Sequence, residues 1–287
     1  MTNNKLNLNN YKQEIADLYT RRSVNYDNSA WHLRIAHLLV EYAQLTPGQS
    51  ILDIATGTGM VAIEAARIVG STGNVIGIDI SSGMLEQARQ KVAELEKNNI
   101  KLNIEFQLAD AEALDFPINS FDQILCASAF IWMQDIQTAL IHWAKFIKPG
   151  GIICFHAFAD TAFIGGIIAQ KVATKYGINL EFSKPTGTVE KCRQLLNASG
   201  FEVVDIKIDR EDSGYISLEK AKLMWAGSSH PAPGQYPNPL SHISLTELTQ
   251  LKVEYDVEIE ALNTEEGVWN DVTTFMYWVV NYSSQNI

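Results

Sequence analysis

Cysteine is scarce in this chain, and its three cysteines, Cys126, Cys154 and Cys192, are scattered along the sequence. An odd number of cysteines without C-x-x-C spacing argues against a disulfide framework and against a structural metal site. We therefore expect buried, reduced thiols of a cytosolic protein, and we expect no metal.

Basic residues are also few: 22 Lys and Arg stand against 33 Asp and Glu, for a formal net charge of -11. Proteins that bind nucleic acids usually carry a basic patch, and anionic membrane surfaces attract basic segments. The first residues lack the apolar core of a signal peptide, and no apolar run approaches the roughly 18 residues of a transmembrane helix. We therefore expect a small-molecule partner, no nucleic acid and no membrane insertion; the oligomeric state is left open.

Hydrophobic residues make up 46% of the chain, enough for a sizeable core. Short apolar runs alternate with segments of helical periodicity. The expected strands are 50–54, 74–79, 103–108, 121–127 and 151–158, and the expected helices between them are 60–69, 83–97 and 138–147. Apolar runs of this kind are typical of strands covered on both faces, and strand–helix alternation predicts a doubly wound parallel sheet. The fold class is therefore α/β.

The most informative segment is Ser50–Gly59, an apolar run that ends in Asp53 and the turn Gly57-Thr58-Gly59. Glycine lets the backbone turn sharply and approach a ligand, and the following helix points its first N–H groups at the same place. Asp79 ends the next apolar run, where a carboxylate can accept hydrogen bonds from a ribose diol.

Two ligands fit this segment. Residues 57–62 satisfy G-x-G-x-x-[G/A], the dinucleotide fingerprint, which predicts an NAD(P)-dependent oxidoreductase. Asp53 argues against it, because a carboxylate at the strand end repels a pyrophosphate. It suits S-adenosyl-L-methionine (SAM), whose ammonium group it could hold directly or through water.

The segment resembles motif I of the class I SAM-dependent methyltransferases, with Ala55 where many members have the first glycine. Segments 106–112, 119–128 and 146–151 resemble later motifs in the order that the family requires. Within the family, the chain looks closest to the type-11 branch, which includes ubiquinone and menaquinone biosynthesis enzymes and natural-product methyltransferases. The resemblance implies a seven-stranded, mostly parallel Rossmann-like sheet with an α-helical cap, and direct in-line transfer of the SAM methyl group, leaving S-adenosyl-L-homocysteine.

The resemblance, together with the strand-end positions, also gives the expected cofactor residues, with Asp110 facing the adenine amino group and the Ala111 N–H near it. The full set is Asp53, Ala55, Gly57, Gly59, Asp79, Ile80, Met84, Asp110, Ala111 and Ser128.

A catalytic base is needed only if the acceptor is a neutral alcohol, a phenol or an acidic carbon. Many type-11 relatives carry a histidine after the fourth strand, where this chain has Ile131. His156 is the best other candidate for a base, although it is more often a structural histidine. His230 and His242 flank a proline-rich loop that could reach a pocket.

Aromatic residues are the candidates for the walls of a substrate pocket, although each is individually more typical of a core. They are Tyr19, Tyr26, Trp31, Phe130 and Trp132. The acceptor is expected to be a specialised metabolite or a quinone-like compound, and the acceptor atom is left open. A catalytically silent SAM-binding partner protein is the other alternative.

We expect a single methyltransferase domain over residues 1–287. Residues 1–45 would form a helical lid, 46–160 the SAM-binding core, 161–185 and 210–270 cap insertions, and 186–209 and 271–287 the rest of the sheet.

Overall fold

The computed structural model describes residues 6–180, 185–225, 240 and 243–281. It divides into two compact units. The first unit comprises Met1–His156, Arg193–Ile206 and Met276–Ile287, and the second comprises Ala157–Cys192 and Lys207–Phe275. The second unit takes in nearly all of the segments that the sequence predicts as cap insertions. The interpretation of the whole chain as one domain stays a prediction.

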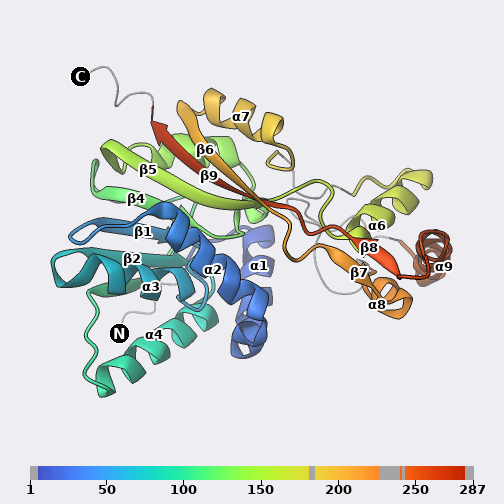
Figure 1. Ribbon diagram of the computed structural model, residues 1–287, viewed down its shortest axis with the longest axis horizontal. Coiled ribbons are helices and arrows are strands. Elements are labelled where there is room, and N and C mark those ends of the chain that lie inside the picture. Colours follow the sequence, from blue (N-terminus) through green and yellow to red (C-terminus); the bar gives the residue numbers. More distant parts are fainter. Residues whose placement is uncertain (1–5, 181–184, 226–239, 241–242, 282–287) are drawn as a thin grey trace. The chain divides into compact units, whose positions relative to one another are not determined.

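A seven-stranded sheet runs through the described part of the chain, in the order β3-β2-β1-β4-β5-β9-β6 (Figure 1). The strands are β1 (Ser50–Ile54), β2 (Asn74–Asp79), β3 (Ile104–Leu108), β4 (Phe121–Cys126), β5 (Ile147–Phe158), β6 (Phe201–Asp209) and β9 (Thr274–Asn281). Strands β1 to β5 pair in parallel. Strand order reverses between β1 and β4, which is the switch point at which open α/β sheets bind ligands. The predicted fold class is confirmed.

The helices that follow the first strands lie where the sequence pattern predicts them, although the third ends at Trp143 rather than at 147, and β5 begins at Ile147 rather than at 151. They are α3 (Met60–Val69), α4 (Ser82–Lys97) and α5 (Ile136–Trp143). Small residues of α3, among them Ala62 and Ala65, are fully buried in a core cluster with β1 and β2, since their size lets the helix lie close to the sheet. The helix 60–69 and the strands 50–54 and 74–79 have the bounds that the sequence predicts.

Two helix starts differ from the pattern. The N-cap of α4 is Ser81, whose hydroxyl accepts the Met84 N–H, so that the helix begins one residue earlier than predicted. The α5 helix begins at Ile136 rather than 138, because the Asp135 carboxylate caps it through the Thr138 N–H at 2.9 Å.

The N-terminal part of the chain, which the sequence predicts to be helical, forms two helices separated by a 3-10 turn. These elements are α1 (Asn10–Arg22), η1 (Ser23–Asn28) and α2 (Ala30–Ala43). Asn9 caps α1 by accepting the Lys12 N–H. The helix α7 (Val189–Ala198) precedes β6.

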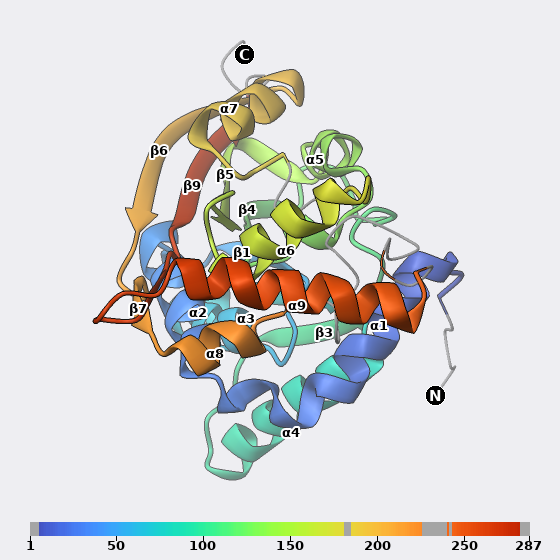
Figure 2. The same cartoon turned by 90° about the vertical axis from the view of Figure 1, so that its right-hand side faces the viewer.

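The second unit has its own small core. Its elements are α6 (Ile164–Lys175), β7 (Gly214–Ile216), α8 (Leu218–Leu223), α9 (Leu245–Ala261) and β8 (Val268–Asn270). Figure 2 shows α6, α8 and α9 side by side, and Ala169, Trp225, Leu251 and Tyr255 pack together between them. Ser244 and Glu247 form a capping box at the start of α9. The antiparallel pair β7–β8 was not predicted.

The proline-rich segment 230–239, with His230, and His242 lie outside the described residues. Among the helices of the described part, none is long and apolar enough to cross a membrane.

Candidate active site

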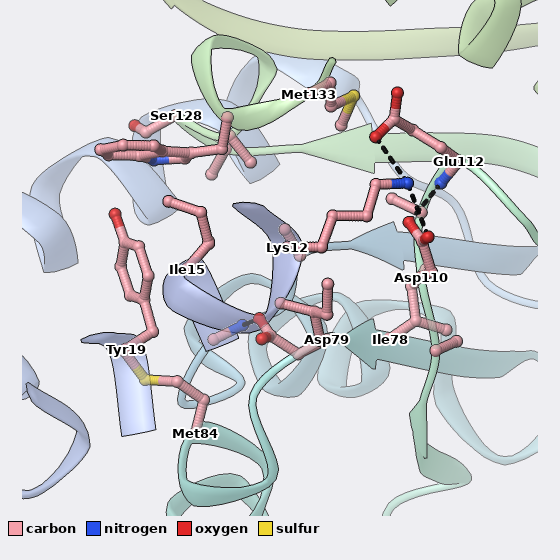
Figure 3. A pocket seen from close by; sticks show the side chains of 18 of the residues that line it. Lys12, Ile15, Tyr19, Ile78, Asp79, Met84, Asp110, Glu112, Ser128 and Met133 are labelled. Atoms are coloured by element: carbon pink, nitrogen blue, oxygen red, sulfur yellow. Dashed lines mark hydrogen bonds and ion pairs between the residues drawn. The ribbon is translucent and has the colours of Figure 1, made fainter. Parts of the chain in front are cut away.

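A cavity lies in the first unit, at the carboxyl ends of β1, β2 and β4 (Figure 3). It contains about 760 Å³ of empty space, part of it open to solvent. The cofactor residues predicted from sequence that line it are Ala55, Gly57, Asp79, Ile80, Met84, Asp110, Ala111 and Ser128. The structure therefore brings residues from four separate segments together at the predicted edge of the sheet.

The turn after β1 runs through the left-handed region of backbone space. Ala55, Gly57 and Gly59 have φ values of 55°, 57° and 81°. Glycine adopts such values without strain, whereas alanine does so at a cost of roughly 1–2 kcal/mol. The Thr56 N–H donates to the Ile78 carbonyl at 2.8 Å and ties the turn to β2. Gly59 is buried at the N-cap of α3, so its role is to form the turn.

Asp79 is 8% exposed, and both of its carboxylate oxygens accept backbone hydrogen bonds. Oδ2 accepts from the Gly57 N–H and Oδ1 from the Ser81 N–H, each at 2.8 Å. Burial raises the pKa of Asp79 to about 6, because the charged form is disfavoured away from water, although these hydrogen bonds oppose the shift. The carboxylate is thus fixed in orientation and gains from a ligand that donates hydrogen bonds to it.

Asp53 is 1% exposed and faces a second, smaller cavity of about 420 Å³. Ala55, Gly57 and Ser128 line both cavities, so the two adjoin at the glycine turn. The Thr56 hydroxyl donates to Asp53 Oδ2 at 2.5 Å. Burial, with the nearby charge of Asp79, raises the pKa of Asp53 to about 7. A cation bound in the second cavity would stabilise the ionised form.

Asp110 lies at the opposite side of the main cavity from Tyr19 and Met84 (Figure 3). The Lys12 ammonium donates to Asp110 Oδ2 at 2.6 Å and lies 2.9 Å from Glu112 Oε2. Burial lowers the pKa of Lys12, but the two carboxylates more than reverse this, so that its pKa is raised. Helix α1 is thereby anchored to the loop after β3.

The rest of the N-terminal segment is also attached to the cofactor loops. Thr20 and Ser81 share a hydrogen bond of 2.8 Å between their hydroxyl oxygens. The Thr58 hydroxyl donates to Asp27 Oδ1 at 2.6 Å, and Lys91 forms an ion pair with the same carboxylate. These contacts attach α1 to the loop after β2 and η1 to the glycine turn. The interpretation of residues 1–45 as a lid stays a prediction.

Ser128 follows β4 and has a φ of 59°, an uncommon value for a residue with a side chain. Its hydroxyl oxygen lies 2.8 Å from Nδ1 of His156, which is fully buried in β5. His156 is therefore one hydrogen bond away from the cavity that Ser128 lines. Its role as a base stays a prediction.

The five aromatic candidates for pocket walls separate into two groups. Tyr19, Tyr26 and Trp132 line the main cavity. Phe130 instead packs in the core, stacked on Phe155 with ring centroids 4.3 Å apart and 1% exposed. Trp31 lies edge-on against His156 at 5.9 Å.

Several residues of the cavity were not predicted from sequence, chiefly Tyr11, Lys12, Ile15, Glu112 and Met133. Lys12 contacts Asp110, which is 98 positions away in the chain, and no local sequence pattern predicts such a pairing. Tyr11 and Ile15 could have been found, because they recur at helical spacing with Tyr19 on one side of α1.

These residues fit SAM. Asp79 offers oriented oxygens to the hydroxyl groups of a ribose, Asp53 offers a buried carboxylate to an ammonium group, and Met84 and Ile80 offer apolar surface to a purine. A pyrophosphate would instead be repelled by the Asp53 carboxylate, which disfavours the dinucleotide interpretation of the same glycines.

Comparison with known proteins also indicates a methyltransferase. The family model of a methyltransferase domain matches residues 51–151. Aklanonic acid methyltransferase DauC from Streptomyces sp. (strain C5) is 34% identical over 147 residues, which cover 50% of this chain and 65% of that protein. Ubiquinone/menaquinone biosynthesis C-methyltransferase UbiE from Cronobacter sakazakii is 31% identical over 175 residues, which cover 55% of this chain and 68% of that protein. The chain thus spans about two thirds of the length of these relatives.

The solved structure of the [4+2]-cyclase SpnF superposes on this chain with a TM-score of 0.53 and 18% sequence identity. The match covers 87% of this chain and 81% of the SpnF chain. At this identity the likeness shows the fold alone, and a fold does not by itself decide a reaction. The reaction class follows from the sequence relatives and from the ordered motifs. The chain belongs to the class I SAM-dependent methyltransferases, in the branch that includes UbiE, and its cofactor is SAM.

Proposed function

We propose that this methyltransferase acts on a small, flat, largely apolar acceptor, either a specialised metabolite or a quinone-like compound. The observation that carries the proposal is the aromatic wall of the main cavity, formed by Tyr19, Tyr26 and Trp132. The Tyr19 ring lies 5.8 Å from Trp132 and 6.2 Å from Tyr26, measured between centroids. Such rings offer edges and faces to a planar molecule.

The two tyrosines are suited to be walls rather than bases. Burial raises the pKa of Tyr26 to about 12 and raises the pKa of Tyr19 as well, so that both phenols are neutral at physiological pH. Neutral, partly buried rings limit the access of water to the main cavity. Exclusion of water and a fixed orientation are the main requirements of this chemistry, because the bound cofactor supplies a methyl group that its sulfonium already activates.

The names of the relatives support the acceptor class. One is named for aklanonic acid and the other for ubiquinone and menaquinone. The absence of a basic excess in this chain also favours an uncharged acceptor over a highly anionic one.

The test is methyl transfer from labelled SAM to a panel of hydroquinones, naphthoquinols and polycyclic phenols, with wild type, Trp132→Ala and the control Ile141→Ala. Ile141 is 45% exposed on α5. Removing the indole should raise KM for the acceptors roughly 10- to 100-fold, the scale of one buried aromatic side chain. The affinity for S-adenosylhomocysteine should stay within about threefold, as a wall for the acceptor predicts.

Equal acceptor KM in wild type and Trp132→Ala would contradict the assignment of this wall. Tight binding of S-adenosylhomocysteine with no transfer to any acceptor would favour a catalytically silent SAM-binding protein.

A further inference from the structure

We propose that Ser128 and His156 form a proton relay, in which the Ser128 hydroxyl takes the proton of a hydroxylated acceptor and passes its own proton to Nδ1 of His156. This rests on the proposed function, because it requires an acceptor that must lose a proton. Ser128 would be the catalytic residue that touches the acceptor, and His156 a residue that acts through it.

The sheet register brings the two residues together. In the parallel pair β4–β5, Cys126 lies opposite Phe155. His156 is the next residue on β5, and Ser128 lies just beyond the end of β4 at the mouth of the sheet. The oxygen–nitrogen distance of 2.8 Å is that of a well-formed hydrogen bond.

The backbone conformation of Ser128 indicates that the surrounding structure fixes the position of this residue. A residue with a Cβ at a φ of 59° is strained, and strain of this kind persists where the surrounding structure fixes it, often at functional sites. The same residue lines both cavities, which places it where the two adjoin.

The surroundings of His156 hold the ring in one orientation. The side chain is fully buried in β5, and the Trp31 indole lies edge-on against it at 5.9 Å. A buried imidazole is costly unless it is hydrogen-bonded, and the bond to Ser128 offsets that cost. Because the ring does not line the cavity, a direct role as base would require it to move, whereas a relay through Ser128 does not.

Other ionisable groups of the cavity already have hydrogen-bond or ion-pair partners in the protein, or are neutral phenols. Lys12 and Asp110 are bonded to each other, and both oxygens of Asp79 accept backbone N–H groups. Tyr19 and Tyr26 are neutral phenols. Ser128, which lines the main cavity, is hydrogen-bonded through its hydroxyl to the imidazole of His156.

In the proposed step, the acceptor O–H bond breaks and its proton forms a new O–H bond on Ser128, while the former Ser128 proton forms an N–H bond on His156. The acceptor oxygen bonds to the methyl carbon as the carbon–sulfur bond breaks, and that electron pair stays on sulfur. The imidazolium returns its proton through Ser128 to water when the product leaves.

The first test needs no acceptor. We would record the imidazole ¹⁵N signals of His156 with S-adenosylhomocysteine bound, in wild type, Ser128→Gly and Ser120→Gly. Glycine suits the φ of position 128, so the fold should survive. Loss of the hydroxyl should shift the Nδ1 signal, whereas the control, whose hydroxyl donates to the Pro117 carbonyl outside the cavity, should not shift it. Identical Nδ1 signals in wild type and Ser128→Gly would overturn the coupling.

The second test uses phenols of graded acidity as acceptors. Ser128→Gly should lower kcat about 100-fold on weakly acidic phenols, the usual scale of general base catalysis, and only a few-fold on nitrophenols that are already ionised. An equal loss across the series would mean that Ser128 only positions the acceptor, and would overturn the relay. If wild type methylates no phenol, the proposed function fails, while the ¹⁵N experiment still decides the Ser128–His156 coupling.

Discussion

The backbone N–H of Gly57 donates a 2.8 Å hydrogen bond to Oδ2 of Asp79, across the carboxyl ends of the neighbouring strands β1 and β2. One residue of the glycine turn thus orients the carboxylate that ends the next strand. The Asp79 carboxylate is therefore already oriented before a ligand binds, since this bond and the one from the Ser81 N–H fix its plane.

Asp79→Ala should weaken S-adenosylhomocysteine binding by roughly 1–3 kcal/mol, because it removes the acceptor of ligand hydrogen bonds and leaves the Gly57 N–H unpaired. Titration calorimetry measures this directly. Asp115→Ala, which removes an exposed carboxylate, is the matched control and should bind as wild type does. Unchanged affinity in Asp79→Ala would refute the ribose assignment.

Cofactor binding should be linked to pH. Burial raises the pKa of Asp53 to about 7 and that of Asp79 to about 6. An ammonium group beside Asp53 and ribose hydroxyls that donate to Asp79 both favour the ionised carboxylates. The affinity for S-adenosylhomocysteine should therefore rise between pH 5 and 7, by up to about tenfold per pH unit for each proton released, and level off above this range. Asp53→Asn should flatten the upper part of that curve. A flat wild-type curve would show that the ligand contacts neither carboxylate in its ionised form.

The protein without cofactor should show the opposite trend in stability. A carboxyl group whose pKa is higher in the folded state than its ordinary value of 3.8 binds more protons when folded, so the stability it contributes is lost as pH rises through the folded pKa. The contribution of Asp53 and Asp79 to the free energy of unfolding should fall between about pH 4 and 7. Urea denaturation of wild type and Asp53→Asn over this range measures the difference in their free energies of unfolding. The asparagine variant should become more stable relative to wild type as the pH rises.

Ala55→Gly should stabilise the protein by about 0.5–1 kcal/mol. Relief of the positive φ at position 55 stabilises the folded state by roughly 1–2 kcal/mol. The greater conformational freedom of glycine in the unfolded chain offsets about 0.4–1 kcal/mol of this gain. The reciprocal change Gly57→Ala should be destabilising, although a Cβ there would meet no atom within 4 Å. Chemical denaturation of both variants isolates the backbone effect, and a shift of both in the same direction would contradict it.

Lys12→Met should loosen helix α1. The substitution leaves Asp110 and Glu112 facing each other with side chains only 16% and 12% exposed, and a loss of about 1–2 kcal/mol is expected at low salt. Hydrogen exchange of the α1 amides should accelerate, while Lys97→Met, on the exposed side of α4, should leave it unchanged. Unaltered exchange in Lys12→Met would show that the Lys12 ion pairs do not hold α1 in place.

The sequence by itself determined the first βαβ unit. Strands 50–54 and 74–79 and helix 60–69 have the predicted bounds. Their signals are local: a short apolar run, glycines at a turn and a helix of small residues. The positions of Asp79 and Asp110 at the sheet edge also followed from sequence, because parallel strands end at a common edge once their order is known.

Tertiary structure decided what local patterns do not encode. Phe130 and Trp132 are two residues apart, yet one lies in the core and the other lines the cavity, because a single 3-10 turn points them in different directions. The pairing of Lys12 with Asp110, and the hydrogen bond between Ser128 and His156, join segments 98 and 28 positions apart. Such pairs depend on where the folded chain brings distant backbone together, which is set by the packing of the whole sheet and its helices.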